Sequence, residues 1–222
     1  LEVKSLIRLL TLKEFFRGDK MKQNCKVGVN KIDITPDDNR MLIAGSLHTR
    51  GYDIIKNPLY IKTIVISSGD SKIAIITLDL IRISTVEKIN KVKTEIEKKT
   101  GIKPQNVLIC PSHTHSGPYT DTMRFEPPFP VLEKEIELHK NYMEKVYECM
   151  VESVSNANND LEDCKLGIAK GEVEGVSHHR RVLKDVDDCW NTWLIPREEW
   201  DIYPAAGPVD TCLYMLVAVT KD

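Results

Sequence analysis

Residues 72–118 read KIAIITLDLIRISTVEKINKVKTEIEKKTGIKPQNVLICPSHTHSGP. The stretch begins with an apolar, β-branched run over 72–78, which predicts a strand. Apolar residues then recur at helical spacing, at Val86, Ile89, Val92 and Ile96. Gly101 stands where this helix is expected to end, and a second short apolar run follows at 107–110. Strand, helix and strand in this order predict a βαβ unit with two parallel strands.

Local signals flank this unit. Ser84 and Glu87 have the spacing of a capping box, so we expect Ser84 to be the N-cap of the helix. Another apolar β run over 60–67 precedes the unit. Four turn-forming residues, 68–71 (SGDS), join it to the run at 72–78, which predicts a β-hairpin with a four-residue connection.

The rest of the chain predicts further strands and one long helix. Residues 25–34, 165–173 and 213–219 read as strands, the last two separated by a loop-rich, aromatic stretch. An amphipathic helix of roughly 25 residues is marked by Leu132, Ile136, Met143, Tyr147, Met150 and Val154. His139 falls near its apolar stripe, where we expect a structural histidine rather than a ligand. The fold class expected is α/β (mixed α+β), with layered sheets and flanking helices.

Composition and motifs exclude several function classes. The 222 residues carry 31 basic and 33 acidic side chains, a net charge of -2 that gives no electrostatic footprint for nucleic acid or an anionic membrane. Motifs for dinucleotide binding, phosphate loops and zincins are absent. We therefore expect a small-molecule partner. The six cysteines form no CxxC pair, and reduced thiols in a cytoplasmic protein are the simplest account of them.

Residues 1–20 are set apart from the functional argument. They read as an amphipathic helix or as extra upstream translation, because Met21 looks like a natural start just before the first strand. Their apolar run is too short to span a membrane and is interrupted by charge, so no transmembrane segment is expected. Residues 21–222 are expected to belong to a single domain.

A pair of histidines follows the second strand of the βαβ unit. In an extended backbone His113 and His115 project to the same side, where they can meet one metal ion, or one metal and its substrate. Parallel strands end at one edge of a sheet, so Asp79, directly after the first strand, is expected beside His113. This arrangement favours a metal-assisted hydrolase. The alternative is a strand end whose imidazoles bond to nearby backbone or water.

A second polar cluster lies at residues 176–182 (VSHHRRV). Adjacent histidines on a strand point to opposite faces, so only one of His178 and His179 could face a given site. Arg180 or Arg181 could supply a bidentate donor to a substrate oxygen. The alternative is a solvated polar edge.

Taken in order, several stretches resemble the amino-terminal catalytic domain of the neutral/alkaline non-lysosomal ceramidases and their bacterial relatives. The matching stretches are residues 27–36 (VGVNKIDITP), Ala44-Gly45 with Arg50 and Asp53, residues 57–59 (NPL), the hairpin over 61–80, residues 112–118 (SHTHSGP), His179-Arg180-Arg181 and residues 207–210 (GPVD). The likeness covers roughly residues 25 to 222.

The resemblance implies zinc-dependent hydrolysis of an amide, in ceramides the N-acyl bond of a sphingolipid. It implies that His113 is the first zinc ligand, that His115 contacts the substrate or its oxyanion, and that Arg180 orients the substrate. Asp79 is added as a catalytic candidate from the strand-edge geometry alone. His179 stands where the family usually has asparagine, which keeps another amide or an ester open as the substrate.

In the family, a second zinc histidine, a glutamate, a tyrosine and a serine lie further along than this chain extends. We therefore expect an incomplete domain, truncated at its carboxyl end and inactive alone, with secretion left open by the resemblance. Two other interpretations remain. One is a ceramidase-like binding module without catalysis. The other is a histidine-pair metal hydrolase of the amidohydrolase type, or of the metallo-β-lactamase type.

Overall fold

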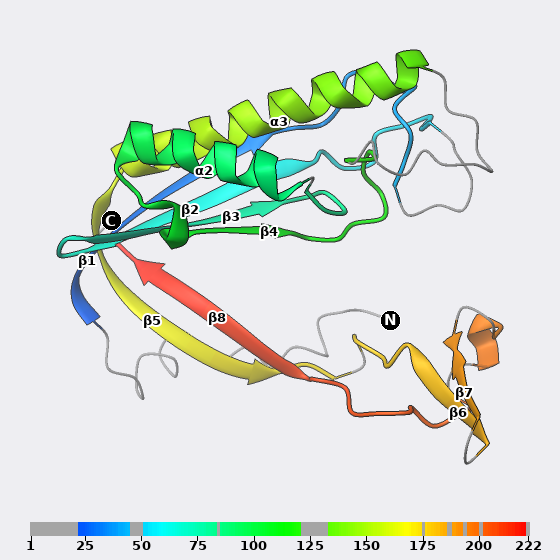
Figure 1. The fold of residues 1–222 in the computed structure, drawn as a ribbon. Helices are drawn as coiled ribbons and strands as arrows, with labels where there is room; N and C mark the ends of the chain where they lie inside the picture. The colour runs from blue at the N-terminus through cyan, green and yellow to red at the C-terminus, as the bar shows by residue number, and fades with distance from the viewer. Residues whose placement is uncertain are drawn as a thin grey trace. The chain divides into compact units, whose positions relative to one another are not determined.

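A computed structural model describes residues 22–44, 51–83, 85–120, 133–174, 176–185, 188–192, 195–199 and 202–220. Its elements in chain order are β1 (Lys22–Asp33), β2 (Tyr60–Ser68), β3 (Ser71–Leu78), α2 (Val86–Thr100), the short 3-10 helix η2 (Pro104–Asn106), β4 (Val107–Pro111), α3 (Glu133–Asn159), β5 (Glu162–Glu172), β6 (Arg181–Asp185), β7 (Asp188–Asn191), the 3-10 helix η5 (Arg197–Glu199) and β8 (Cys212–Val219). The larger sheet has the order β4-β3-β2-β1-β5-β8, and β6 pairs with β7. This architecture confirms the expected mixed α+β class (Figure 1).

The chain divides into two compact units. Among the described residues, the first unit comprises Gln23–Lys165 with Val219 and Thr220, and the second comprises Leu166–Ala218 with Lys22; β5 runs from one into the other. The predicted leader over residues 1–20, the proposed family matches Gly45 and Arg50, and the expected cap residue Ser84 lie outside the described residues.

In the first unit the predicted hairpin and βαβ unit are both present. β2 and β3 pair antiparallel, and β3 and β4 pair parallel with α2 between them. Strand pairing continues to Ser68 and Ser71, so only Gly69 and Asp70 connect the strands, and the expected four-residue connection was wrong. Gly69 has a φ of 55°, a conformation that glycine adopts without steric cost and that tight hairpin turns require.

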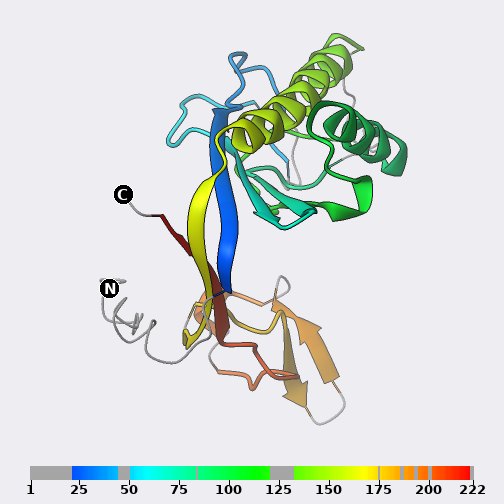
Figure 2. The same ribbon diagram turned by 90° about the vertical axis from the view of Figure 1, so that its left-hand side faces the viewer.

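Helices α2 and α3 pack side by side over one face of the sheet in the first unit (Figure 1 and Figure 2). The core between them is built from alternate residues of the strands and apolar stripes of the helices: Ile61, Val65, Ala74, Ile76, Leu78, Val92, Ile96, Val146, Met150 and Val154. Burial of each valine, leucine, isoleucine or methionine side chain in this core stabilises the folded state by about 1.5–3 kcal/mol relative to leaving it exposed. This core fixes the strand edge from which the candidate site projects.

The helix boundaries agree with the sequence patterns except at one cap. Helix α2 ends at Gly101, with a φ of 72°, as predicted. Its N-cap is Thr85, whose hydroxyl accepts from the backbone N–H of Lys88, so the assignment of Ser84 as N-cap was wrong. Helix α3 spans 27 residues, which confirms the long amphipathic helix.

The second unit contains a small hairpin and the greater parts of β5 and β8. β6 pairs antiparallel with β7, and Val182 within it is buried. Strand β6 begins only at Arg181, so His178 and His179 are not on a strand, and the prediction of opposite faces for them was wrong. Among the described residues, no helix has the length and apolar character needed to cross a bilayer.

Candidate active site

The two histidines follow β4 at the edge where β3 also ends. Beyond the last strand pair, the backbone N–H of Ser112 donates to the carbonyl of Leu78 at 2.8 Å, and that of His113 donates to the carbonyl of Leu80 at 3.0 Å. Residues after β4 therefore stay beside residues after β3. The predicted placement of Asp79 and His113 at one sheet edge is confirmed.

The side chain of His113 is oriented by a backbone carbonyl. Its Nδ1 lies 2.8 Å from the carbonyl oxygen of Ile81. Because a carbonyl can only accept, Nδ1 carries a proton, which in the neutral imidazole leaves the lone pair on Nε2. His113 also has a φ of 59°, in the left-handed region that non-glycine residues rarely occupy and that costs roughly 1–2 kcal/mol.

His115 lies next to His113, with the ring centroids 5.1 Å apart and the ring planes at 65°. Both residues are exposed. Their proximity was predicted from an extended backbone, but the left-handed conformation of His113 means that the backbone is not extended there. The neighbouring turn is held by the N–H of Ser116, which donates to the hydroxyl of Thr114 at 3.2 Å.

Asp79 has a structural partner at this edge. Its Oδ2 accepts from the backbone N–H of Tyr60 at 3.0 Å, and its own N–H donates to the carbonyl of Tyr60, also at 3.0 Å. The carboxylate therefore fixes the start of β2. A catalytic role for Asp79 stays a prediction.

A cleft of about 390 Å³ opens beside His115. Residues 114–118 line one part of it, and the remaining lining residues are Thr35, Pro36, Met41, Ile43, Tyr52, Ile54, Ile55, Lys56, Asn57 and Leu59. Most of these side chains are apolar, so the cleft suits a substrate with an aliphatic part. Ile54 is 79% exposed, which leaves apolar surface in contact with solvent.

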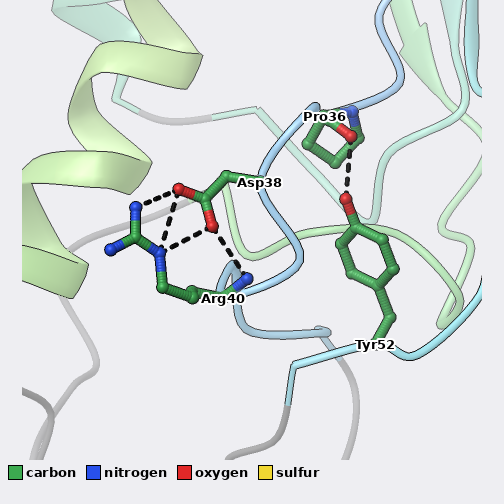
Figure 3. A network of polar contacts seen from close by, with 4 residues as sticks. All are labelled: Pro36, Asp38, Arg40 and Tyr52. Atoms are coloured by element: carbon green, nitrogen blue, oxygen red, sulfur yellow. Dashed lines mark hydrogen bonds and ion pairs between the residues drawn. The ribbon is translucent and has the colours of Figure 1, made fainter.

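Hydrogen bonds tie together the two loops that carry these lining residues. The hydroxyl of Tyr52 donates to the carbonyl of Pro36 at 2.8 Å, and the N–H of Leu59 donates to the hydroxyl of Thr35 at 2.8 Å. Next to them, Arg40 forms a bidentate ion pair with Asp38 (Figure 3). Hydrogen bonds from the side chain and backbone of Arg40 lower the pKa of Asp38 to about 2.

Thr35, Pro36 and residues 57, 59 and 114–118 belong to stretches that resemble the ceramidase family, but the sequence did not predict that they share a cleft, because they lie in loops without periodicity. The one available signal was the adjacent pair Ile54 and Ile55 in a loop that is otherwise polar.

Arg180 belongs to the second unit. It precedes β6, is exposed, and accepts at its carbonyl from the N–H of Thr192 at 2.9 Å. The neighbouring His179 accepts at Nδ1 from the N–H of Arg181 at 3.1 Å. A Cβ at Gly207 would lie 3.0 Å from Nε2 of His179, so two of the matching family stretches are in contact here. His113, His115 and Asp79 are brought together in the first unit, while the role of Arg180 stays a prediction.

The class that these features define is an α+β domain with a histidine pair at the edge of a parallel strand pair, beside an apolar cleft. Residues 25–185 match the family model "Neutral/alkaline non-lysosomal ceramidase, N-terminal", and the chain belongs to this family.

Two solved structures share the fold. One, described as "Ceramidase complexed with C2", has a TM-score of 0.64 and 19% sequence identity. The match covers 90% of this chain and 29% of the chain in that structure. The other is the neutral ceramidase from Pseudomonas aeruginosa, with a TM-score of 0.63 and 20% sequence identity. The match covers 90% of this chain and 30% of the chain in that structure. This chain thus spans less than a third of those proteins. No curated protein matches the chain.

Proposed function

We propose that this chain contributes to a zinc-dependent hydrolase that cleaves an amide bond, in a ceramide-like N-acyl substrate or another amide or ester. Membership of the ceramidase family supports the reaction class. The observation that carries the proposal is the geometry of His113, whose Nδ1 is held by the Ile81 carbonyl while the ring of His115 lies 5.1 Å away.

The orientation of His113 fits a metal ligand. Metal-binding histidines commonly donate one ring N–H to a carbonyl or carboxylate and bind the metal through the other nitrogen. Nε2 of His113 would be that nitrogen. Among the residues that the structure describes, however, no group of three or more His, Cys, Asp or Glu side chains is placed to hold a metal. Since zinc takes about four ligands, the proposal requires further ligands from elsewhere in the protein.

The chain's own residues would bind and orient the substrate. The apolar cleft next to His115 would hold an aliphatic part, with the scissile carbonyl near the two histidines. His115 can then donate a ring N–H to the oxygen of that carbonyl as negative charge develops on it. When bound, zinc would supply Lewis-acid polarisation of the same carbonyl. Arg180 is proposed to orient the substrate. Asp79, whose carboxylate accepts from the backbone N–H of Tyr60 at this strand edge, is proposed as a further catalytic residue.

The test measures zinc content and hydrolysis of a short-chain N-acylsphingosine by the full-length protein. His113→Ala should lower both, the hydrolysis by on the order of a hundredfold or more, because it removes a metal ligand. His178→Ala, which removes an exposed histidine in the second unit, is the matched control for zinc content. Near-stoichiometric zinc that survives His113→Ala would contradict the proposal.

Two outcomes separate the alternatives. Zinc binding without hydrolysis of any amide or ester would favour a ceramidase-like binding module. Hydrolysis of an acyl ester, but not of an N-acyl amide with the same acyl chain, would replace ceramide with an ester substrate. The amidohydrolase alternative requires a closed barrel of parallel strands, whereas β1, β2 and β3 of the larger sheet pair antiparallel and only the pair next to the site, β3 and β4, is shown to be parallel among the described strand pairs.

A further inference from the structure

His139 is a buried histidine that the proposed chemistry does not use. It projects from α3 and is only 1% exposed. Its Nε2 accepts from the backbone N–H of Leu42 at 3.0 Å, and its Nδ1 lies 3.0 Å from the carbonyl oxygen of Tyr119. Because an N–H must donate to Nε2 while a carbonyl must accept from Nδ1, the ring is neutral and carries its proton on Nδ1. The structural role predicted for His139 is thus confirmed, with partners that the sequence did not reveal.

The two segments that His139 joins also bind each other. The N–H of Ala44 donates to the carbonyl of Gly117 at 2.9 Å, and the N–H of Tyr119 donates to the carbonyl of Leu42 at 2.8 Å. Ile43 and Pro118 form an isolated antiparallel bridge between these bonds. His139 on α3 therefore joins the segments around Leu42 and Tyr119 into one junction, in which Leu42 and His139 are 97 positions apart in the chain.

Both segments reach the candidate site. Met41 and Ile43 line one part of the cleft, and residues 114–118 line another. Tyr119 follows Pro118 directly and lies four residues after His115. Tyr119 is therefore joined to the histidine pair by a short, hydrogen-bonded loop.

We propose that His139 is a positioning residue of the active site, which holds the loop with His113 and His115 against the segment at residues 41–44 through two backbone hydrogen bonds. The role in catalysis depends on the proposed function, whereas the role in holding the loop does not. No other side chain type of this size offers an acceptor and a donor on opposite edges of one rigid ring. Loss of the bond to Leu42 leaves a buried backbone N–H without its acceptor, and loss of the bond to Tyr119 removes a donor from a half-buried carbonyl.

Three substitutions separate the two bonds. His139→Asn keeps a donor near the position of Nδ1, and His139→Gln keeps an acceptor near the position of Nε2. His139→Leu removes both while keeping an apolar side chain of similar volume. Ser153→Ala is the matched control, because Ser153 is on the same helix, is fully buried, and donates to the hydroxyl of Thr63 in β2, away from both loops.

The first measurement is hydrogen exchange of the full-length protein in peptides that cover residues 41–44 and 113–120. His139→Leu should speed exchange in both segments by about tenfold or more, whereas Ser153→Ala should leave them unchanged. His139→Gln should preserve protection near Leu42, and His139→Asn should preserve it near Tyr119. Unchanged exchange of both segments in His139→Leu would overturn the proposal. If the leucine variant does not fold, unchanged exchange of both segments in His139→Gln and in His139→Asn would overturn it.

The second measurement is kcat and KM of the same variants on the N-acyl substrate. His139→Leu should lower kcat by about tenfold or more with a smaller effect on KM, and the amide variants should recover part of the loss. Wild-type activity in His139→Leu, despite faster exchange, would also overturn the positioning role. If the wild-type protein neither binds zinc nor hydrolyses the substrate, the proposed function fails, and the exchange experiment alone still decides whether His139 holds the loop.

Discussion

The backbone of His113 adopts its left-handed conformation between two hydrogen bonds, one from its N–H to the carbonyl of Leu80 and one from its ring to the carbonyl of Ile81. Neither bond can be seen in the sequence, since both partners lie in the loop after the neighbouring strand. Glycine would take the same conformation at no steric cost, so the histidine here is consistent with selection for its imidazole.

This conformation predicts an inverted order of two variants at position 113. His113→Gly should be more stable than His113→Ala by about 1 kcal/mol, because alanine keeps the strained φ and glycine relieves it. At ordinary positions in helices and strands, glycine is the less stable of the two. The free energy of unfolding of both variants in urea measures the difference. Equal stability, or a more stable alanine variant, would show that φ at position 113 is not strained in solution.

Gly28 predicts a second effect of a single added methyl group. A Cβ on Gly28 would lie 1.8 Å from the carbonyl oxygen of Ala157, so β1 passes the end of α3 too closely for any side chain. Gly28→Ala should destabilise the protein by about 2–3 kcal/mol, because backbone has to move. Gly171→Ala is the control, since an added Cβ there meets nothing within 4 Å. A change in melting temperature no larger than that of the control would mean that α3 ends elsewhere.

Among the elements, periodic patterns were predicted well and boundaries set by competing hydrogen bonds were not. The apolar positions of α2 and α3 appeared directly in the sequence. The N-cap was misplaced by one residue because Ser84 and Thr85 both carry a hydroxyl, and the extended backbone of Thr85 decides between them. Before β6, the ring of His179 bonds to the backbone of Arg181, and such local side-chain bonds compete with strand pairing.

Helix α3 carries a pH-dependent contribution to stability through His139. Burial lowers the pKa of His139, against the smaller opposing effects of the Tyr119 carbonyl and of Glu135 on the same helix. The unfolded chain therefore binds more protons than the folded chain just below the ordinary histidine pKa of about 6.5. Above this ordinary pKa, the neutral ring makes its full contribution to the free energy of unfolding. It is lost as the pH falls from there toward the lower pKa of the folded state.

We expect the free energy of unfolding to decrease between pH 7.5 and 5.5, by at most about 1.4 kcal/mol for one group over the single unit below its ordinary pKa. His139→Gln should remove this dependence, which urea denaturation at both pH values measures directly. Asp38, the ion-pair partner of Arg40, does not contribute to this pH dependence, because its pKa of about 2 places its titration far below this range. A pH dependence that persists in the glutamine variant would assign the effect to other groups.

At the scale of the molecule, the order of elements predicted where the site lies, but not what surrounds it. Parallel pairing of β3 and β4 was enough to place Asp79 beside His113. The cleft depends instead on loops joined over long sequence distances, as in the hydrogen bond that the N–H of Leu42 donates to His139, 97 positions further along the chain. Nothing in the sequence around Leu42 encodes that contact, since its donor is a backbone N–H that every residue except proline possesses.

The same placement predicts how tightly the two histidines bind zinc. It contributes two neighbouring imidazoles, and in the described residues no third His, Cys, Asp or Glu side chain joins them in a metal-binding group. Zinc sites use about four ligands, and even loss of a supporting hydrogen bond weakens binding by about 10–100-fold. We therefore expect the 222-residue chain to bind zinc at least on the order of a hundredfold more weakly than the full-length protein, and to show no hydrolysis. Competition with a chromophoric chelator measures both affinities, with a His113→Ala, His115→Ala double variant of the chain as the background. Zinc bound by the chain as tightly as by the full-length protein would mean that its histidines find their remaining ligands within these residues, and that the proposed division of the site along the polypeptide is wrong.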